Sequence, residues 1–260
     1  MNSILFFQIW ALALNVWRES VRDKLVQILA ASGILLMLVS LVFGNMAIGG
    51  QNRILQDMNF WVLGIWGLVA VLYMGSNIVK NELQRKTIYL ILARPVNRSA
   101  FLTGKFFGMA LVLTTTFCLL ALAGLTLMQL KGIVITSKHL WALVFIWGEW
   151  ILLAAISLFF ASFTSPILHN FFLVGISFLG HWSNDLRIFS ENTKDLLIKG
   201  LLNAIYHILP NLEALNFREA ALYNDVIAPS VLTQGALVLI GWTLSALIAA
   251  NIVFIRRRLL

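Results

Sequence analysis

Long apolar runs alternate with short polar segments along most of this 260-residue chain. Several runs approach or exceed the roughly 20 apolar residues that cross a bilayer core. They lie at about 25–48, 60–79, 101–130, 140–163, 167–180 and 231–255. The runs lack the short period-two alternation of a membrane β-barrel. The pattern therefore predicts an all-α polytopic membrane protein with six transmembrane helices, forming one domain over residues 1–260.

Residues 4–22 show an amphipathic pattern instead of a uniformly apolar one. One stripe at helical spacing is polar and consists of Gln8, Asn15, Arg18, Glu19 and Arg22. The apolar positions include Phe6, Trp10, Ala13 and Trp17. This pattern predicts a helix lying in the membrane interface with aromatic anchors. The alternative is a short first transmembrane helix that ends at Arg18.

The stretch 182–230 is the longest polar region between predicted spans. Within it, residues 195–208 place many leucines and isoleucines around Lys199 and Asn203. We expect one or two amphipathic helices that lie on, or dip into, the outer leaflet. Helical order should break near Pro210. The stretch also offers a surface for a partner protein on the outer side of the membrane.

Composition supports a membrane protein and gives the chain an orientation. Hydrophobic residues make up 60% and charged residues 12%, about half the charged fraction typical of a soluble domain. Six spans place both termini on one side, which carries 12 of the 19 basic residues and three acids; the other side carries seven of each. The basic side should be cytoplasmic, in a plasma membrane or bacterial inner membrane. The net charge of +8 is therefore a topology signal and does not indicate nucleic acid.

A charged segment, 82–105, separates the second and third apolar runs. Residues 82–92 can form a short helix, and Pro95 disfavours helical geometry at Arg94. An ordinary positively charged cytoplasmic loop also fits this composition. The residue pattern is more specific, because Glu82, Thr87, Leu92, Pro95-Val96, Arg98 and Gly104-Lys105 follow one another. This order resembles the signature of ABC-2 type transporter permeases.

A second stretch, 209–217, reads Leu-Pro-Asn-Leu-Glu-Ala-Leu-Asn-Phe. It is similar to the Pro-Asn-Leu stretch that some permeases of this family carry before their last span. The layout of the whole chain resembles the family as well. Two positions depart from the usual pattern: Lys86 stands where Gly is usual before the Thr, and Gln84 where a second acid is common.

The resemblance implies that residues 82–93 form a cytoplasmic coupling helix that docks on a separate ABC ATPase. The implied ATPase-coupling residues are Glu82, Gln84, Arg85, Lys86, Thr87, Pro95 and Arg98. ATP and Mg²⁺ would bind to the ATPase, and this chain has no Gly-x4-Gly-Lys-Ser/Thr phosphate loop. We therefore expect a non-catalytic subunit without a cofactor of its own. Two copies, as a homodimer in membrane lipid, would work with two ATPases, with the link 162–170 as a second contact.

Glu149 is the one acid within a predicted span. An ionisable side chain at that depth is costly and suggests a function. It could contact a polar substrate, a proton path or a partner subunit. Alternatively, it is a protonated side chain that is hydrogen-bonded to a neighbouring helix.

Other candidate sites are weaker. The histidines at 139, 169, 181 and 207 are scattered and do not have metal-site spacing, and we expect His169 at the surface of the cytoplasmic link. We find no catalytic triad order or paired carboxylates. Small residues recur every fourth position at Ala100, Gly104 and Gly108, and again at Gly241, Ser245 and Ala249. These two rows predict close helix packing.

Our leading interpretation is the membrane subunit of an ATP-driven exporter. A six-span scaffold, a subunit that transmits motion, or a membrane enzyme without transport is the alternative. A secondary transporter is disfavoured because ion coupling usually needs several polar residues in mid-span.

Overall fold

The computed structural model describes residues 2–46, 49–85 and 98–256, and these residues are mostly helical. The helices are α1 (Asn2–Val21), α2 (Lys24–Met46), α3 (Gln51–Arg85), α5 (Arg98–Leu130), α6 (Ser137–Ala161), α7 (Pro166–His181), α8 (Ser183–Asn192), α9 (Leu196–Ile208), α10 (Arg218–Tyr223) and α11 (Pro229–Arg256). A short 3₁₀ turn, η1, covers Glu213–Leu215. Within the described ranges no strand occurs, which agrees with the all-α prediction.

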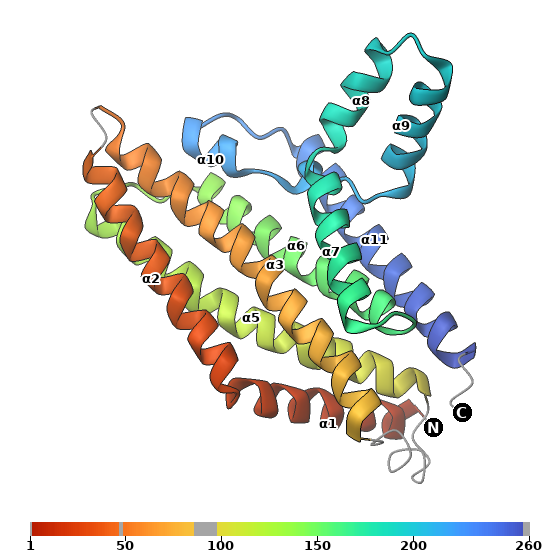
Figure 1. The fold of residues 1–260 in the computed structure, drawn as a ribbon. Coiled ribbons are helices and arrows are strands. Elements are labelled where there is room, and N and C mark those ends of the chain that lie inside the picture. The colour runs from red at the N-terminus through yellow and green to blue at the C-terminus, as the bar shows by residue number, and fades with distance from the viewer. Residues whose placement is uncertain (1, 47–48, 86–97, 257–260) are drawn as a thin grey trace.

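The long helices form one tilted bundle (Figure 1). α6 is the most buried of them, whereas α2 and α11 expose most of their side chains. α1 runs across the lower end of the bundle, and α8 and α9 project from the opposite end. The starts of α1 and α5 and the ends of α3 and α11 share the lower end. This common end supports the prediction that both termini lie on one side of the membrane.

Among the described helices, five are long and apolar enough to cross a membrane: α2, α3, α5, α6 and α11. The predicted fifth span corresponds to α7, which has 16 residues and is therefore about 24 Å long. A bilayer core is about 30 Å thick. α7 runs from the lower towards the upper end of the bundle, but its crossing of the membrane stays a prediction.

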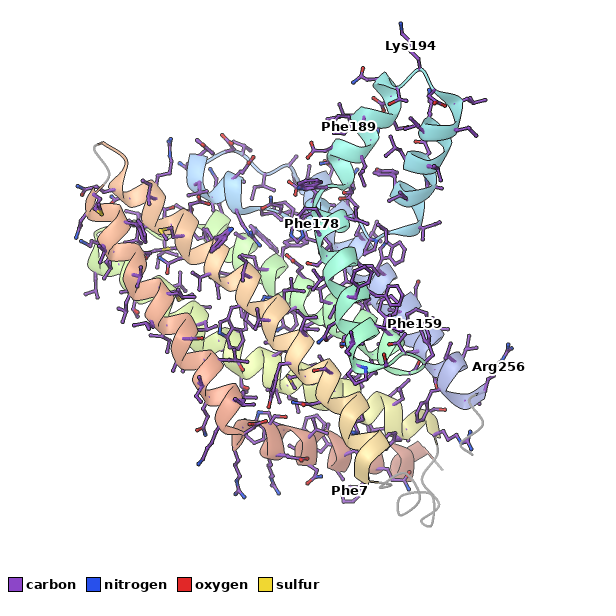
Figure 2. All side chains as sticks on the ribbon, in the orientation of Figure 1. Phe7, Phe159, Phe178, Phe189, Lys194 and Arg256 are labelled. Carbon is purple, nitrogen blue, oxygen red and sulfur yellow. The ribbon has the colours of Figure 1, made fainter. Side chains whose placement is uncertain are left out.

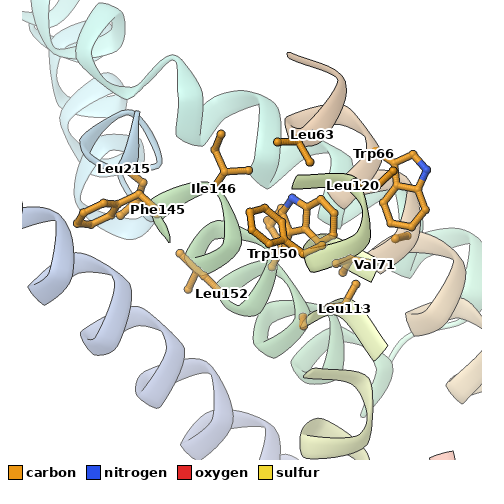
Figure 3. Packing of buried hydrophobic residues seen from close by; sticks show 14 of the residues in the cluster. Leu63, Trp66, Val71, Leu113, Leu120, Phe145, Ile146, Trp150, Leu152 and Leu215 are labelled. Atoms are coloured by element: carbon orange, nitrogen blue, oxygen red, sulfur yellow. The ribbon is translucent and has the colours of Figure 1, made fainter. Parts of the chain in front are cut away.

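Trp150, on α6, lies at the centre of the core and is completely buried. Its ring stacks on Trp66 of α3 at 5.4 Å and meets Phe117 of α5 edge-on at 5.1 Å (Figure 3). A side chain on Gly67 would collide with the Trp150 indole. The aromatic contacts of Trp150 thus hold α3, α5 and α6 together. The glycine at position 67 leaves the space that the Trp150 indole occupies.

The first row of small residues is a packing seam, as predicted, and its partner is α1. A Cβ on Gly104 would lie 2.8 Å from the Cβ of Leu12, and one on Gly108 would lie 2.6 Å from the Cβ of Val16. Both distances are too short for real side chains, so the glycines let α1 press onto α5. α1 is not among the described helices that are long and apolar enough to cross a membrane, and its position in the membrane interface stays a prediction.

The second row behaves differently, because it lies on the outward face of α11. Gly241 and Ser245 are exposed, and a Cβ on Gly241 would meet no described atom within 4 Å. Within this chain, the predicted seam therefore has no partner among the described residues.

The short polar segment 51–59, between the first two apolar runs, is predicted from its polarity to be a loop. This prediction is wrong, because these residues form the first turns of α3. Two of their polar side chains, Gln56 and Asn59, are buried in the fold, whereas Gln51, Asn52, Arg53 and Asp57 are exposed. Gln56 Oε1 lies 3.0 Å from His139 Nε2, and Asn59 Nδ2 donates to the Leu55 carbonyl at 2.7 Å. Hydrogen bonds to α6 and to the helix itself stabilise positions that their polarity alone assigned to a loop.

The predicted surface position of His169 is also wrong. α7 begins at Pro166, a favoured first helical residue, so only 162–165 link α6 to α7. His169 is completely buried, with its Nε2 at 2.9 Å from Ser157 Oγ and its Nδ1 at 2.9 Å from Asn170 Oδ1. A side chain on Gly75 would collide with Ser157, so α3, α6 and α7 meet around this histidine.

Candidate functional site

Glu149 is the centre of a polar cluster near the upper end of the bundle. It lies on α6 and is only 5% exposed. Its Oε1 lies 3.4 Å from Nε2 of His181, at the end of α7. Its Oε2 lies 3.9 Å from Nη2 of Arg218, at the start of α10. The cluster therefore joins three elements, and we call these three residues the outer cluster.

Arg218 reaches Glu149 across α3, at a position where α3 has no side chain. A Cβ on Gly64 would collide with the Arg218 guanidinium. The guanidinium thus lies directly against the backbone of α3 while facing a carboxylate of α6. Because both ions are largely shielded from water, removing either one would leave the other without its compensating charge.

The stretch 209–217 brings Arg218 into this position. Asn216 Oδ1 accepts from the Arg218 backbone N–H at 3.3 Å, and Asn216 Nδ2 donates to Glu213 Oε1 at 3.1 Å. Asn211 Oδ1 accepts from the Ser183 hydroxyl at 2.6 Å and from the Ala214 N–H at 3.0 Å. The two asparagines of the stretch 209–217 therefore stabilise the conformation of this stretch by hydrogen bonds.

Apolar side chains of the same stretch close the upper end of the bundle. Leu212, Leu215 and Phe217 are buried, and the ring of Phe217 lies 4.4 Å from that of Phe145 on α6. The Leu212 N–H donates to the Gly180 carbonyl at 3.0 Å. The stretch 209–217 thus closes the upper end of the bundle together with α10, which follows it. We call residues 209–224 the cover.

Two contacts anchor the far edge of this cover. Lys138 Nζ donates to Asn224 Oδ1 at 2.6 Å, and Asn224 ends α10 in a left-handed conformation with φ 59°. The Arg53 guanidinium lies 4.5 Å from the centroid of the Tyr223 ring. The first turns of α3 and α6 therefore hold the end of α10.

Glu213 adds a second carboxyl beside the outer cluster. Burial raises the pKa of Glu213 above its usual value, and the hydrogen bond from Asn216 and the nearby charge of His181 oppose this effect. As the pH falls, Glu213 therefore binds a proton at a higher pH than an exposed glutamate does.

The predicted ATPase-coupling residues lie at the other end of the bundle. Glu82, Gln84 and Arg85 form the end of α3 without a break from its membrane portion. Lys86, Thr87 and Pro95 lie outside the described residues. The coupling helix at 82–93 therefore stays a prediction beyond its first residues.

Arg98 is the coupling candidate whose contacts the structure describes. It is the first residue of α5, and its Nη1 donates to the Ile255 carbonyl at 3.1 Å, in the last turn of α11. A positive charge at this C-terminal turn also complements the helix dipole. Arg98 thus links the chain after the 82–98 segment to the end of the last span.

The sequence identified Glu149 but missed His181 and Arg218. Arg218 is the one basic residue between 200 and 230, and it directly follows the Pro-Asn-Leu motif. A buried acid in the middle of a span needs a cation within reach, so this arginine could have been nominated. His181 offered no comparable signal. Within the described ranges, no group of three or more His, Cys, Asp or Glu residues could hold a metal ion.

Comparison with known proteins gives one finding. The family model of the ABC-2 family transporter proteins matches residues 2–259. No curated protein matches the chain.

Proposed function

This chain belongs to the ABC-2 transporter family, and we propose from this premise that it is the membrane subunit of an ATP-driven exporter with a separate ATPase. The family match over residues 2–259 is the observation that carries the proposal. It confirms the resemblance of the chain to the ABC-2 permeases. It also favours a transport component over the membrane-enzyme and secondary-transporter alternatives. A subunit that transmits motion to another protein is the second candidate.

The length of α3 supports coupling through the 82–98 segment. Its 35 residues make a helix about 52 Å long, whereas the bilayer core is about 30 Å thick. α3 therefore extends beyond the core, and its charged end, Glu82–Arg85, lies on the basic side that we assign to the cytoplasm. We expect Glu82, Gln84 and Arg85 to contact the ATPase together with Lys86, Thr87, Pro95 and Arg98, while ATP and Mg²⁺ stay on that partner.

The same helix connects the ATPase end with the outer cluster. Gly64, against which Arg218 lies, is 21 residues before Arg85, or about 32 Å along one helix. Packed helices move as rigid bodies. A push on the end of α3 would therefore shift the surface beneath Arg218. We propose that this shift loosens the outer cluster and lets the cover move during export.

A second copy of the chain would complete the transporter. The row Gly241, Ser245 and Ala249 supports this, because its first two residues are exposed on α11 and small residues let helices approach closely. We expect a homodimer in the plasma or bacterial inner membrane, with both termini in the cytoplasm and α7 as the fifth of six spans. The outer segment 182–230 is available to an outer-side partner.

The decisive experiment is co-purification of the full chain with ABC ATPases of its source cell. Charge reversals Glu82→Lys and Arg85→Glu should abolish ATPase binding and the stimulation of ATP hydrolysis. The matched control is Arg187→Glu on α8, which breaks an exposed pair with Glu191 at 3.0 Å on the outer side. Survival of ATPase binding in both reversals would show that the coupling assignment is wrong.

A further inference from the structure

A small cavity is lined by residues of α1, α2, α3 and α5 and by Asp23 between α1 and α2. These helices come together at the lower end of the bundle (Figure 1). Its volume is about 100 Å³, enough for several waters or one small polar group. The lining combines apolar, neutral polar and charged side chains: Val16, Glu19, Ser20, Asp23, Val26, Tyr73, Met74, Asn77 and Lys105. Neither the coupling segment nor the outer cluster uses this cavity.

Asp23 is fixed in one wall of the cavity by two hydrogen bonds. Its Oδ1 accepts from the Leu25 N–H at 2.9 Å, at the start of α2, and its Oδ2 accepts from the Tyr73 hydroxyl at 2.6 Å. A carboxylate has about four acceptor sites, so Asp23 can accept a further donor. With Glu19 it makes a wall that carries two acids.

Lys105, on α5, is a positively charged residue of the lining, and its Nζ also lies 5.1 Å from the centroid of the Phe101 ring. Among the described lining residues, the cavity thus presents two carboxylates and one ammonium group. This combination suits a ligand that itself carries a cation beside an anion, and it disfavours a ligand with net negative charge. The exposed Arg22 and Lys24 flank Asp23 and add positive charge at the rim, where phosphates are attracted.

The polarity of this region follows the order of groups in a phospholipid. Asp23 lies at the elbow between the interfacial helix α1 and the first long apolar helix, which is headgroup depth on the cytoplasmic side. Next to the cavity is a void of about 10 Å³, too small for an acyl chain, whose mostly apolar lining shares Val26, Tyr73 and Met74 with the cavity. Charged walls at the membrane surface therefore give way to apolar walls towards the membrane interior.

We propose that this cavity binds the headgroup of a zwitterionic phospholipid with a primary amine, of the phosphatidylethanolamine type. The ammonium group donates to Glu19 and Asp23, the phosphate lies towards Lys105, and the acyl chains stay in the surrounding bilayer. A primary ammonium carries three N–H donors, as lysine does, whereas a choline headgroup has none. The proposal rests on the cytoplasmic assignment of this end and is independent of transport.

The test is native mass spectrometry of the full chain, purified with equal amounts of phosphatidylethanolamine, phosphatidylcholine and phosphatidylglycerol. We expect about tenfold greater retention of phosphatidylethanolamine than of phosphatidylcholine, the effect of a charge-assisted hydrogen bond. Equal retention of these two lipids, or a preference for phosphatidylglycerol, would overturn the proposal. At equal concentration, soluble phosphoethanolamine should be retained less than phosphatidylethanolamine; preferential retention of the soluble headgroup would refute the lipid as the occupant.

The double variant Glu19→Gln, Asp23→Asn should reduce this preference to near unity. Asparagine can still cap α2 and accept from Tyr73, so the substitution removes mainly the charge. Lys105→Gln is a second variant that should weaken retention through the phosphate side. Glu191→Gln, on the exposed face of α8, is the matched control and should keep the full preference. A preference that persists in both cavity variants would contradict the assignment, whatever the outcome of ATPase binding.

Discussion

The bundle and the α8–α9 hairpin bury opposite kinds of side chain. In the bundle, Trp150 and its apolar neighbours are inside. In the hairpin, Ser190 is only 1% exposed and donates to Asn203 Oδ1 at 2.8 Å, whereas Phe189, Leu196 and Leu197 are 65–83% exposed. Figure 2 shows the hairpin, with Phe189 and Lys194 labelled, standing away from the bundle.

The comparison shows that one chain uses two ways of stabilising helix pairs. Between the long helices, rings and glycines pack closely. Between α8 and α9, hydrogen bonds hold the pair, and the apolar face is left for something outside the chain. Exposed apolar surfaces of this kind mark membrane or protein contacts, which supports the prediction of an outer-leaflet segment.

The largest effect should come from breaking the centre of the bundle. Trp150→Ala removes a ring that packs on both Trp66 and Phe117, and such truncations cost about 3–5 kcal/mol of unfolding free energy. Thermal unfolding in detergent measures the loss. Trp61→Ala, at a ring 57% exposed on α3, is the matched control and should change little. Similar losses for both would show that the rings contribute through general apolarity.

A smaller effect should follow in the outer cluster, which couples the bundle to its cover. Arg218→Met leaves Glu149 without one of its two partners. We expect a cost of about 2 kcal/mol, below the 3–5 kcal/mol of a fully buried contact pair, because the ions are 3.9 Å apart. A cysteine at Ala221, which is 4% exposed, should then react faster with an aqueous maleimide, in a chain whose Cys118 is replaced. An unchanged reaction rate would show that Arg218 does not hold the cover.

The hairpin should lose less when its polar seam is broken. Ser190→Ala leaves Asn203 Oδ1 without the donor hydroxyl, and a hydrogen bond contributes about 1 kcal/mol. Hydrogen exchange of the α9 amides should accelerate, while exchange in α6 should stay constant. A double-mutant cycle with Asn203→Ala isolates the pair; a coupling energy near zero would mean that the hairpin is held by other contacts.

The smallest effect on folding is expected on the outer face of the hairpin. Leu197→Cys with a spin label should change the unfolding free energy by less than about 0.5 kcal/mol, since surface changes rarely exceed that. In a bilayer, the label should be more accessible to oxygen than to a water-soluble nickel chelate. The same label at Lys194, in the α8–α9 turn, is the control for water exposure. A water-like profile at both positions would exclude insertion into the outer leaflet.

Local pattern predicted much of the fold and part of the candidate site. The amphipathic α1, the five long apolar helices and the break after α9 were all predicted from the sequence, because span length, periodicity and proline act over neighbouring residues. The loop at 51–59 was mispredicted because Gln56 and Asn59 find hydrogen bonds inside the fold. His169 was misplaced for the same reason, since its partner Ser157 lies on another helix.

The sequence by itself determined the membrane class, the basic side of the chain and the family, because composition and ordered motifs are properties of the chain alone. Only the tertiary structure brought His181 and Arg218 to Glu149, across separations of 32 and 69 residues. The tertiary structure also shows that α1 packs against Gly104 and Gly108, whereas Gly241 faces outward. The physical reason is that the partner of a buried charge or a glycine is set by how helices pack. Neighbouring residues in the chain do not contain that information.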